Sequence, residues 1–268
     1  MSGPSTSPIR YRSVFISDVH LGSRGCRADF LLEFLHSIDT ENLYLVGDII
    51  DLWSLKKSFF WPQAHSNVIR TILGKAKHGT RVIYVPGNHD CAFREYQGMV
   101  FGNVEVHREI VHTTADGRRF LVLHGDEFDA VIKASPLIAA LGDRAYSLIM
   151  LLNRAVNCLR GRLGFPYWSI ASYLKHKVKR ATTYIANFER ALAAEARRRG
   201  LDGTICGHIH RAQMSSLDGV LYCNDGDWVE SCTTLTEDFD GRLSLWSWSE
   251  QQAATRTAAV ARPLDQAA

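Results

Sequence analysis

Five short segments, each directly after a run of mostly apolar residues, carry the side chains that most often bind metal ions in proteins. The apolar runs are typical of strands and lie at residues 14–16, 43–46, 82–85, 120–123 and 204–206. The segments that follow them read Asp-Val-His, Gly-Asp, Gly-Asn-His-Asp, His-Gly-Asp and Gly-His-Ile-His, in that order. Loops at strand ends can meet on one rim of a sheet, so we expect these side chains to converge on one site.

The patterns along the chain indicate an α/β fold. Up to residue 126, strand patterns alternate with helical spacing of apolar residues at 27–38 and again at 63–77. Strand patterns return at 204–206, 220–223 and 243–246, with the turn sequences Asp218-Gly219 and Asp240-Gly241 between them. We therefore predict that the second half of the chain closes with a β meander.

The length of the chain sets its domain organisation. With 268 residues, of which 46% are hydrophobic, it is long enough to bury the core of one large domain. We predict a single domain over residues 11–250 that contains a helical insertion, or cap, at 131–199. Residues 1–10 are rich in Ser and Pro, and residues 251–268 are rich in Ala and Gln. We expect both ends to be disordered tails.

The predicted insertion is strongly basic. Between Val131 and Arg180 it holds nine Lys and Arg residues and one acid, Asp143. A basic segment that also contains many apolar residues suits contact with an anionic membrane surface or the covering of an amphiphilic ligand. A packed pair of helices with a solvated basic face explains the same composition, and the sequence leaves both interpretations open.

Composition also limits where the protein acts and what it binds. A formal net charge of +3 is too small to predict specific nucleic acid binding. No apolar run reaches the length of a membrane span, and the N-terminus lacks the apolar core of a signal peptide. The six cysteines form no CxxC pair, which favours reduced thiols. We expect a cytoplasmic protein, with peripheral contact at the inner membrane through the insertion as an alternative. No feature of the sequence indicates an oligomeric state.

The donor types in the five segments favour a hydrolytic metal site. Carboxylate, carboxamide and imidazole groups without thiolate suit Mn, Fe, Co or Zn in a site that keeps open coordination positions. Two such cations about 3.5–4 Å apart can share a bridging carboxylate and stabilise both the attacking and the leaving oxygen at a phosphorus atom. No Ser or Cys stands in an obvious nucleophile motif. We therefore predict two divalent metals, with Mn the first choice, and a metal-activated water as the attacking group.

The five blocks, in this order, resemble those of the calcineurin-like metallophosphoesterase superfamily over roughly residues 14–246. The resemblance implies a four-layer α/β sandwich, in which two mixed β-sheets pack face to face with helices outside, and here with a helical cap inserted. It also implies a complete ligand set: Asp18, His20 and His210 for one metal, Asn88, His124 and His208 for the other, and Asp48 bridging the two.

The same resemblance implies a mechanism. A hydroxide that bridges the metals would attack the phosphorus atom without a covalent intermediate. His89 would protonate the leaving oxygen or stabilise phosphoryl charge, and Asp90 would orient its imidazole ring.

The sequences of three blocks resemble, more specifically, those of the UDP-2,3-diacylglucosamine diphosphatase group. These blocks are Ser-Asp-Val-His-Leu-Gly at 17–22, Gly-Asp-Ile-Ile-Asp-Leu-Trp at 47–53 and His-Gly-Asp-Glu-Phe-Asp at 124–129. That group cleaves UDP-2,3-diacylglucosamine to UMP and 2,3-diacylglucosamine 1-phosphate in lipid A synthesis. Its best-characterised members carry Arg where this chain has His89, which leaves two alternatives. One is a related phosphodiesterase acting on another lipid-linked pyrophosphate or a nucleotide, and the other is a non-catalytic scaffold of the same fold.

Asp51, Trp53 and residues 224–228, which include Asp225 and Trp228, flank the ligand blocks, and they either line the substrate cleft or belong to the support of the site and the core. We expect Asp51 to cap a loop or to support a ligand. For Trp53 and Trp228 we predict packing, with stacking against a uracil or sugar ring as the alternative.

Overall fold

The computed structural model describes residues 7–129 and 179–248. The chain divides into two compact units, Met1–Asp126 with Leu192–Ala268, and Glu127–Ala191. Most of the predicted insertion, together with residues 1–6 and 251–268 of the predicted tails, lies outside the described residues. The described end of the predicted insertion forms helix α7 (Lys179–Arg198), as predicted. None of the helices in the described ranges is long and apolar enough to cross a membrane.

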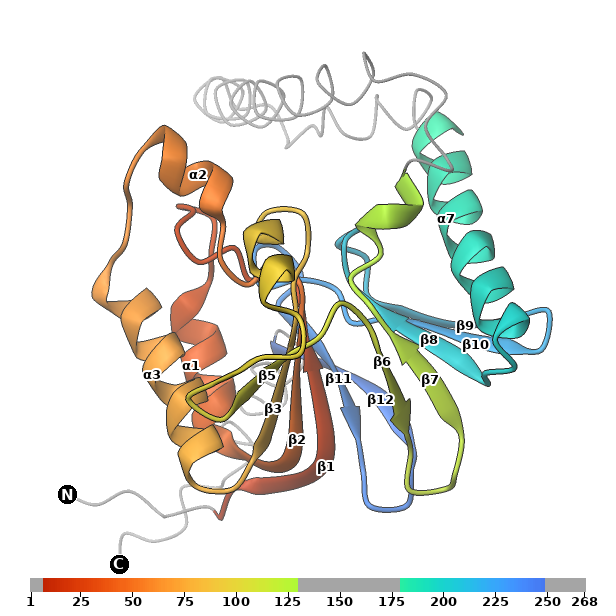
Figure 1. Cartoon of the computed structure of the whole chain (residues 1–268), viewed down its shortest axis with the longest axis horizontal. Helices are drawn as coiled ribbons and strands as arrows, with labels where there is room; N and C mark the ends of the chain where they lie inside the picture. Colours follow the sequence, from red (N-terminus) through yellow and green to blue (C-terminus); the bar gives the residue numbers. More distant parts are fainter. Residues whose placement is uncertain (1–6, 130–178, 249–268) are drawn as a thin grey trace, which may run out of the picture. The chain divides into compact units, whose positions relative to one another are not determined.

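The first unit contains two mixed β-sheets (Figure 1). The larger sheet has the strand order β12-β11-β1-β2-β3-β5-β4, in which β1, β2, β3 and β5 run parallel and the other three antiparallel to their neighbours. Its strands are β1 (Ile9–Ile16), β2 (Ile38–Val46), β3 (Arg81–Val85), β4 (Val100–Phe101), β5 (Val104–Val106), β11 (Thr233–Glu237) and β12 (Leu243–Ser247).

The smaller sheet has the order β6-β7-β8-β10-β9, with a parallel centre and antiparallel edges. Its strands are β6 (Ile110–Thr113), β7 (Arg119–Val122), β8 (Gly203–Cys206), β9 (Gln213–Leu217) and β10 (Val220–Asn224). The predicted fold class is therefore confirmed, because two mixed sheets are flanked by helices.

Alternating residues of each strand place the core on both faces of the larger sheet. On β1, Val14 and Ile16 pack in one cluster with residues of α1 (Ala28–Ser37) and α3 (Gln63–Lys77). Phe15, between them, packs in a second cluster with Phe120 and other residues of the smaller sheet. The period of two along a strand explains this arrangement, since successive side chains point to opposite faces. The larger sheet is thus buried on both sides, which makes its strand ends a rigid base for loops.

The predicted β meander is wrong. The two turn sequences do close hairpins, β9–β10 and β11–β12, but these hairpins belong to different sheets. Strand β10 pairs parallel with β8, and β11 pairs antiparallel with β1 in the larger sheet. Turn chemistry specifies a local hairpin and does not specify which sheet edge the hairpin joins. Strand β1 also begins at Ile9, so the predicted tail over residues 1–10 is two residues too long.

A buried polar cluster connects the two sheets. Glu237 on β11 accepts a hydrogen bond at 2.7 Å from Nη1 of Arg12. Its other oxygen lies 2.9 Å from Nε2 of His112 on β6, whose Nδ1 lies 2.9 Å from the hydroxyl of Tyr44 on β2. Because a carboxylate only accepts, Nε2 donates to Glu237, and Nδ1 is left to accept from the Tyr44 hydroxyl. Burial raises the pKa of Glu237, but hydrogen bonds from His112, Ser13 and Ala115 outweigh this and lower it.

We expect Glu237→Gln to destabilise the protein by about 2 kcal/mol at neutral pH, because a buried charged acceptor is lost. Since its folded pKa is lowered, Glu237 contributes this stability above its unfolded pKa of about 4.3 and loses it as pH falls through the folded value. Urea unfolding of wild type and variant at neutral and acidic pH measures the difference. The exposed Glu41→Gln on β2 is the control. A difference that grows on acidification would contradict this account.

Candidate metal centre

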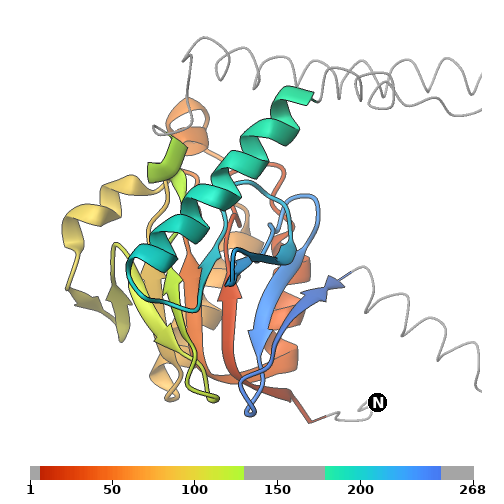
Figure 2. The same cartoon turned by 90° about the vertical axis from the view of Figure 1, so that its right-hand side faces the viewer.

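The five ligand segments follow β1, β2, β3, β7 and β8 and meet at one end of the two sheets (Figure 1). The β6–β7 and β11–β12 turns lie at the opposite end in both views (Figure 2). The convergence expected from the sequence therefore occurs, and all five loops stand on strands of the same unit.

Five of the seven predicted ligands adopt a left-handed backbone conformation that is unusual for residues other than glycine. Their φ angles are 49° for Asp18, 53° for His20, 52° for Asp48, 71° for His208 and 51° for His210. Backbone hydrogen bonds between loops hold them there, for example Asp18 N to Gly47 O at 3.0 Å and His20 N to Asp48 O at 2.9 Å. Such conformations cost about 1–3 kcal/mol each and cluster at functional sites.

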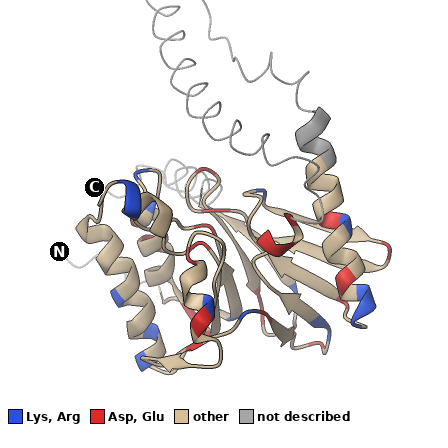
Figure 3. Ribbon diagram, turned by 45° about the horizontal axis from the view of Figure 1, so that its top comes forward, with Lys and Arg blue, Asp and Glu red and all other residues tan. Residues whose placement is uncertain are grey.

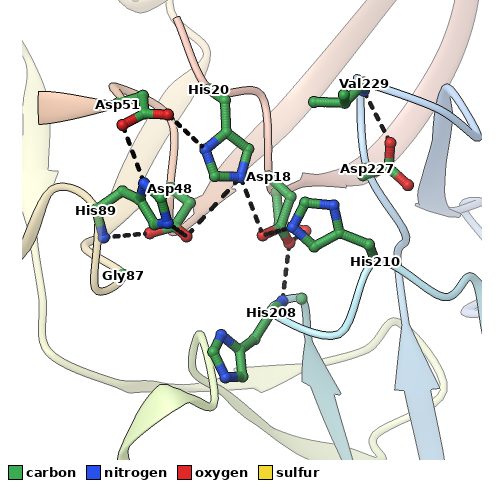
Figure 4. A network of polar contacts seen from close by, with 12 residues as sticks. Asp18, His20, Asp48, Asp51, Gly87, His89, His208, His210, Asp227 and Val229 are labelled. Atoms are coloured by element: carbon green, nitrogen blue, oxygen red, sulfur yellow. Dashed lines mark hydrogen bonds and ion pairs between the residues drawn. The ribbon is translucent and has the colours of Figure 1, made fainter. Parts of the chain in front are cut away.

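Two groups of potential metal ligands consist of predicted ligands only, and a third joins His20 to Asp51 and His89 (Figure 4). In the first, ligand atoms of Asp18, His20 and His210 all lie within 4.8 Å of one another, and Nε2 of His210 is 3.1 Å from Oδ1 of Asp18. In the second, Asp18, Asp48 and His124 meet the same criterion, with His124 Nε2 3.4 Å from Asp48 Oδ2. The first group coincides with one predicted ligand set, and Asp18 belongs to both groups.

The remaining two predicted ligands lie beside the second group. The ring of His208 has its centroid 5.2 Å from that of His124, and the His208 backbone N–H donates to Asp18 Oδ2 at 2.8 Å. Asn88 occupies the loop after β3, and the N–H of the next residue, His89, donates to Asp48 Oδ1 at 2.8 Å.

Several buried atoms at this site that could bind a metal lack hydrogen bonds within the described part of the chain. They are Oδ1 of Asp18, Nε2 of His20, Oδ1 of Asn88 and Nε2 of His124. Asp18 Oδ1 instead makes ion pairs with His20 and His210. Buried polar atoms are seldom left without a partner, so each exception needs an explanation. Four such atoms, all on predicted ligands, fit a site for divalent cations.

The orientation of His124 is fixed from behind. Its Nδ1 lies 2.9 Å from the carbonyl oxygen of Val46, which can only accept, so Nδ1 carries the proton and Nε2 is free to bind a metal. Two glycines make room for this arrangement. A Cβ at Gly47 would lie 2.3 Å from His124 Nδ1, and one at Gly87 would lie 2.3 Å from Asp48 Oδ1. Glycine is therefore required in both blocks.

The carboxylates create a strongly negative site. Burial lowers the pKa of His20, yet the neighbouring carboxylates of Asp18, Asp51 and Asp48 raise it to about 10. Burial likewise lowers the pKa of His124, and the charges of Asp48 and Asp18 raise it to about 10. A field that holds protons on two buried imidazoles also favours metal cations, whose binding would release those protons.

His89 stands beside this group and is held by Asp51. Its Nδ1 lies 3.0 Å from Asp51 Oδ1, and its Nε2 lies 3.9 Å from Asp48 Oδ2. Asp51 also caps helix α2 (Leu52–Lys57) by accepting from the Ser54 N–H at 2.7 Å, and its other oxygen lies 3.4 Å from His20 Nδ1. Burial raises the pKa of Asp51, but the hydrogen bonds from His20, His89 and Ser54 lower it far below its usual range. The expected capping role of Asp51 is confirmed, and its contact with His20 is the one expected of a residue that supports a predicted ligand.

The prediction that Asp90 orients His89 is wrong. The buried Asp90 carboxylate accepts hydrogen bonds from Gly87 N at 2.6 Å, Ile49 N at 2.8 Å and the Tyr84 hydroxyl at 2.5 Å. It therefore ties the loop after β2 to the loop after β3. Adjacent positions in a sequence do not bring two side chains together, and here Asp90 is turned toward the backbone of both loops.

The two tryptophans differ. Trp228 is completely buried, which confirms packing. Trp53 is 46% exposed and its ring lies 4.1 Å from that of His89, so the prediction of packing is wrong for this residue. The sequence indicates no role for Ser17, and for Asp225 it leaves open a place in the substrate cleft or in support of the site. The Ser17 hydroxyl lies 2.7 Å from Asp18 Oδ2 and 2.5 Å from Asp225 Oδ1, and burial raises the pKa of Asp225 well above its usual value.

The sequence is similar to a known protein family and to a known protein. Residues 11–212 match the family described as calcineurin-like phosphoesterase. The UDP-2,3-diacylglucosamine hydrolase of Blochmanniella pennsylvanica (strain BPEN) is 26% identical over 156 residues, 57% of this chain and 57% of that protein. The chain thus matches little more than half the length of this relative.

Solved structures of low sequence identity also resemble the chain. Yfce, a phosphoesterase from E. coli, is 14% identical with a TM-score of 0.47, over 89% of this chain and 94% of its own. A novel archaeal phosphodiesterase is 14% identical with a TM-score of 0.42, over 88% and 98%.

Proposed function

The chain belongs to the calcineurin-like phosphoesterase family, and from this we propose that it hydrolyses UDP-2,3-diacylglucosamine to UMP and 2,3-diacylglucosamine 1-phosphate. The main observation in favour of metal-dependent hydrolysis is that buried N and O atoms on four predicted ligands have no hydrogen bonds among the described residues. The substrate is supported by the wording of three sequence blocks and by the name of the curated relative.

The proposed ligands of two divalent cations are the seven residues predicted from the sequence. Asp18, His20 and His210 would hold one metal, Asn88, His124 and His208 the other, and Asp48 would bridge them. Manganese is our first choice, because oxygen and imidazole donors suit it, although the same donors accept Fe, Co and Zn. When bound, the metals would polarise the phosphoryl group and bring the pKa of a water ligand into the neutral range.

His89 is the residue best placed to serve the leaving group. Its side chain is 23% exposed and its Nε2 points toward the Asp48 side of the site, while Asp51 fixes Nδ1 (Figure 4). The carboxylate at one nitrogen fixes the orientation of the ring, so that the other nitrogen can donate a proton to an oxygen or stabilise its charge. The ring of Trp53 covers one face of the imidazole and limits its rotation.

A second candidate is hydrolysis of another lipid-linked pyrophosphate or of a nucleotide. The observation that favours it is His89 itself, which stands where the best-characterised diphosphatases have Arg. Unlike Arg, a histidine changes its charge near neutral pH, so it serves proton transfer better than permanent pairing with a diphosphate.

Product analysis separates these candidates. The metal-stripped protein, reloaded with Mn²⁺, would be given UDP-2,3-diacylglucosamine in detergent micelles, with an aryl phosphodiester as the control substrate. Mass spectrometry should find UMP and the lipid 1-phosphate. Turnover of the aryl phosphodiester alone would reject the lipid substrate and retain the phosphoesterase chemistry.

A further inference from the structure

Two large aromatic side chains are exposed on helix α2 and on the connection that follows it. Phe59, on the connection, is 81% exposed, more than any other large hydrophobic side chain in the described ranges. Trp53, on α2, is also exposed, whereas Phe60 and Trp61, which directly follow Phe59, are half-buried. Single exposed apolar residues are common on protein surfaces, but two exposed aromatic residues within seven positions of the sequence are less common.

Cations accompany these aromatic residues. Lys56 and Lys57 form the last turn of α2 and are exposed. Arg24, from the loop after β1, places its guanidinium group 4.5 Å from the centre of the Phe60 ring. No Asp or Glu occurs between Leu52 and His89, so α2 and α3 carry basic residues and no acidic ones (Figure 3). We call Trp53, Lys56, Lys57 and Phe59 the α2 patch.

We propose that the α2 patch binds the surface of an anionic lipid bilayer. Phe59 would insert below the head groups, Trp53 would lie at the level of the head groups, and Lys56 and Lys57 would contact lipid phosphates. Aromatic side chains favour this interfacial depth, and each Lys near an anionic surface adds attraction that salt weakens. The absence of acidic residues on both helices removes the repulsion that such a surface would otherwise cause.

The α2 patch is continuous with the metal centre. Trp53 contacts the His89 ring, and α2 begins at Asp51, which holds His89. Contact with the bilayer at this patch would therefore bring the site close to lipid head groups. The value of this arrangement for an acylated substrate rests on the proposed function, whereas membrane binding itself does not.

Flotation of the full-length protein with lipid vesicles tests the proposal without any substrate. Vesicles of phosphatidylcholine with phosphatidylglycerol should bind the wild type at low salt, and pure phosphatidylcholine vesicles should bind it less. Phe59→Ser should weaken the partition at least about tenfold, from the loss of one inserted aromatic ring. Lys56→Gln with Lys57→Gln should weaken it about 25-fold.

Phe239 and Lys77 supply matched controls. Phe239 is 45% exposed beneath Arg10, at 5.3 Å, but lies in the β11–β12 turn at the other end of the sheets. Lys77 ends α3, about 21 Å along the helix from Gln63. Phe239→Ser and Lys77→Gln should leave the partition unchanged. Hydrogen exchange at residues 52–62 should slow on vesicle binding, and that in the β11–β12 turn should not.

Each of the following results would overturn the proposal. The first is a wild type that does not bind anionic vesicles, and the second is variants of the α2 patch that bind vesicles as well as the controls do. Vesicle-independent self-association that Phe59→Ser abolishes would identify a contact between two copies of the chain. Binding of a single-stranded oligonucleotide through the same residues, without vesicle binding, would identify a nucleic acid surface. Phe59→Ser should not change hydrolysis of a soluble aryl phosphodiester, so failure of the proposed function remains distinguishable.

Discussion

Replacing Asp48 with alanine is expected to remove bound metal and nearly all hydrolysis of an aryl phosphodiester. Oδ2 of Asp48 lies 3.4 Å from His124 Nε2 and 3.9 Å from Nε2 of both His20 and His89, so this carboxylate is central to the site. Its loss would remove the proposed bridging ligand and leave neighbouring imidazoles without their counter-charge. Elemental analysis after gel filtration measures the metal, and initial rates at saturating Mn²⁺ measure hydrolysis.

Asp39→Ala is the matched control for this experiment. Asp39 is an exposed residue near the start of β2, the same strand that Asp48 follows at its other end. It should retain both metal and activity. Melting curves of the metal-free proteins would show that each variant is folded. An Asp48→Ala protein that is folded and hydrolyses at near wild-type rate would exclude the bridging role.

His89→Ala should keep its metals and lose about two to four powers of ten in kcat, the range of a general acid or an electrostatic contact. The side chain belongs to neither proposed ligand set, and its contacts are with Asp51, Asp48 and the Trp53 ring. Metal content measured beside kcat separates the loss of a proton donor from the loss of a ligand. The rate constants should be compared at several pH values, because the loss of a general acid should change the pH dependence of kcat.

Asp51→Asn tests the pairing from the other side. An amide can still cap α2 but no longer provides a negative charge next to His89, so we expect a smaller loss of about 10- to 100-fold. Asp90→Asn would lose kcat through the loops rather than through the imidazole, and its melting temperature should fall as well. A His89→Ala enzyme with wild-type kcat, or one that has lost its metals, would contradict the assignment.

The strand ends were predictable because metal ligands and strand periodicity are both local signals. Four of the five apolar runs lie within an observed strand, the run at 120–123 extends one residue beyond β7, and helix α3 has the predicted bounds of Gln63 and Lys77. The loops then converge for a geometric reason, since parallel neighbours place their carboxyl ends on one side. The pairing of β11 with β1 was not predictable, because the choice of sheet edge depends on contacts between residues far apart in the sequence.

Support of the site was harder to predict than its ligands. Asp51 and Asp90 each lie three or fewer residues from a ligand, yet only Asp51 reaches His89. Which of two nearby carboxylates does so depends on the backbone turn between them, and the sequence does not encode that turn in any simple pattern. The connection of Asp225 to Asp18 could not be predicted either. It runs through the hydroxyl of Ser17, which is more than 200 residues from Asp225 in the sequence. The sequence predicts packing for Trp53, and only the structure shows its ring against that of His89.

Metal titration of the full-length protein tests the central claim most directly. Metal-stripped protein would be titrated with Mn²⁺ by calorimetry while hydrolysis of an aryl phosphodiester is followed at each occupancy. For a two-metal site we expect two equivalents of metal per chain, proton release on binding, and hydrolysis that reaches its full rate only when both equivalents are bound. A single equivalent at saturation, or full hydrolysis by the metal-stripped protein, would contradict the two-metal site.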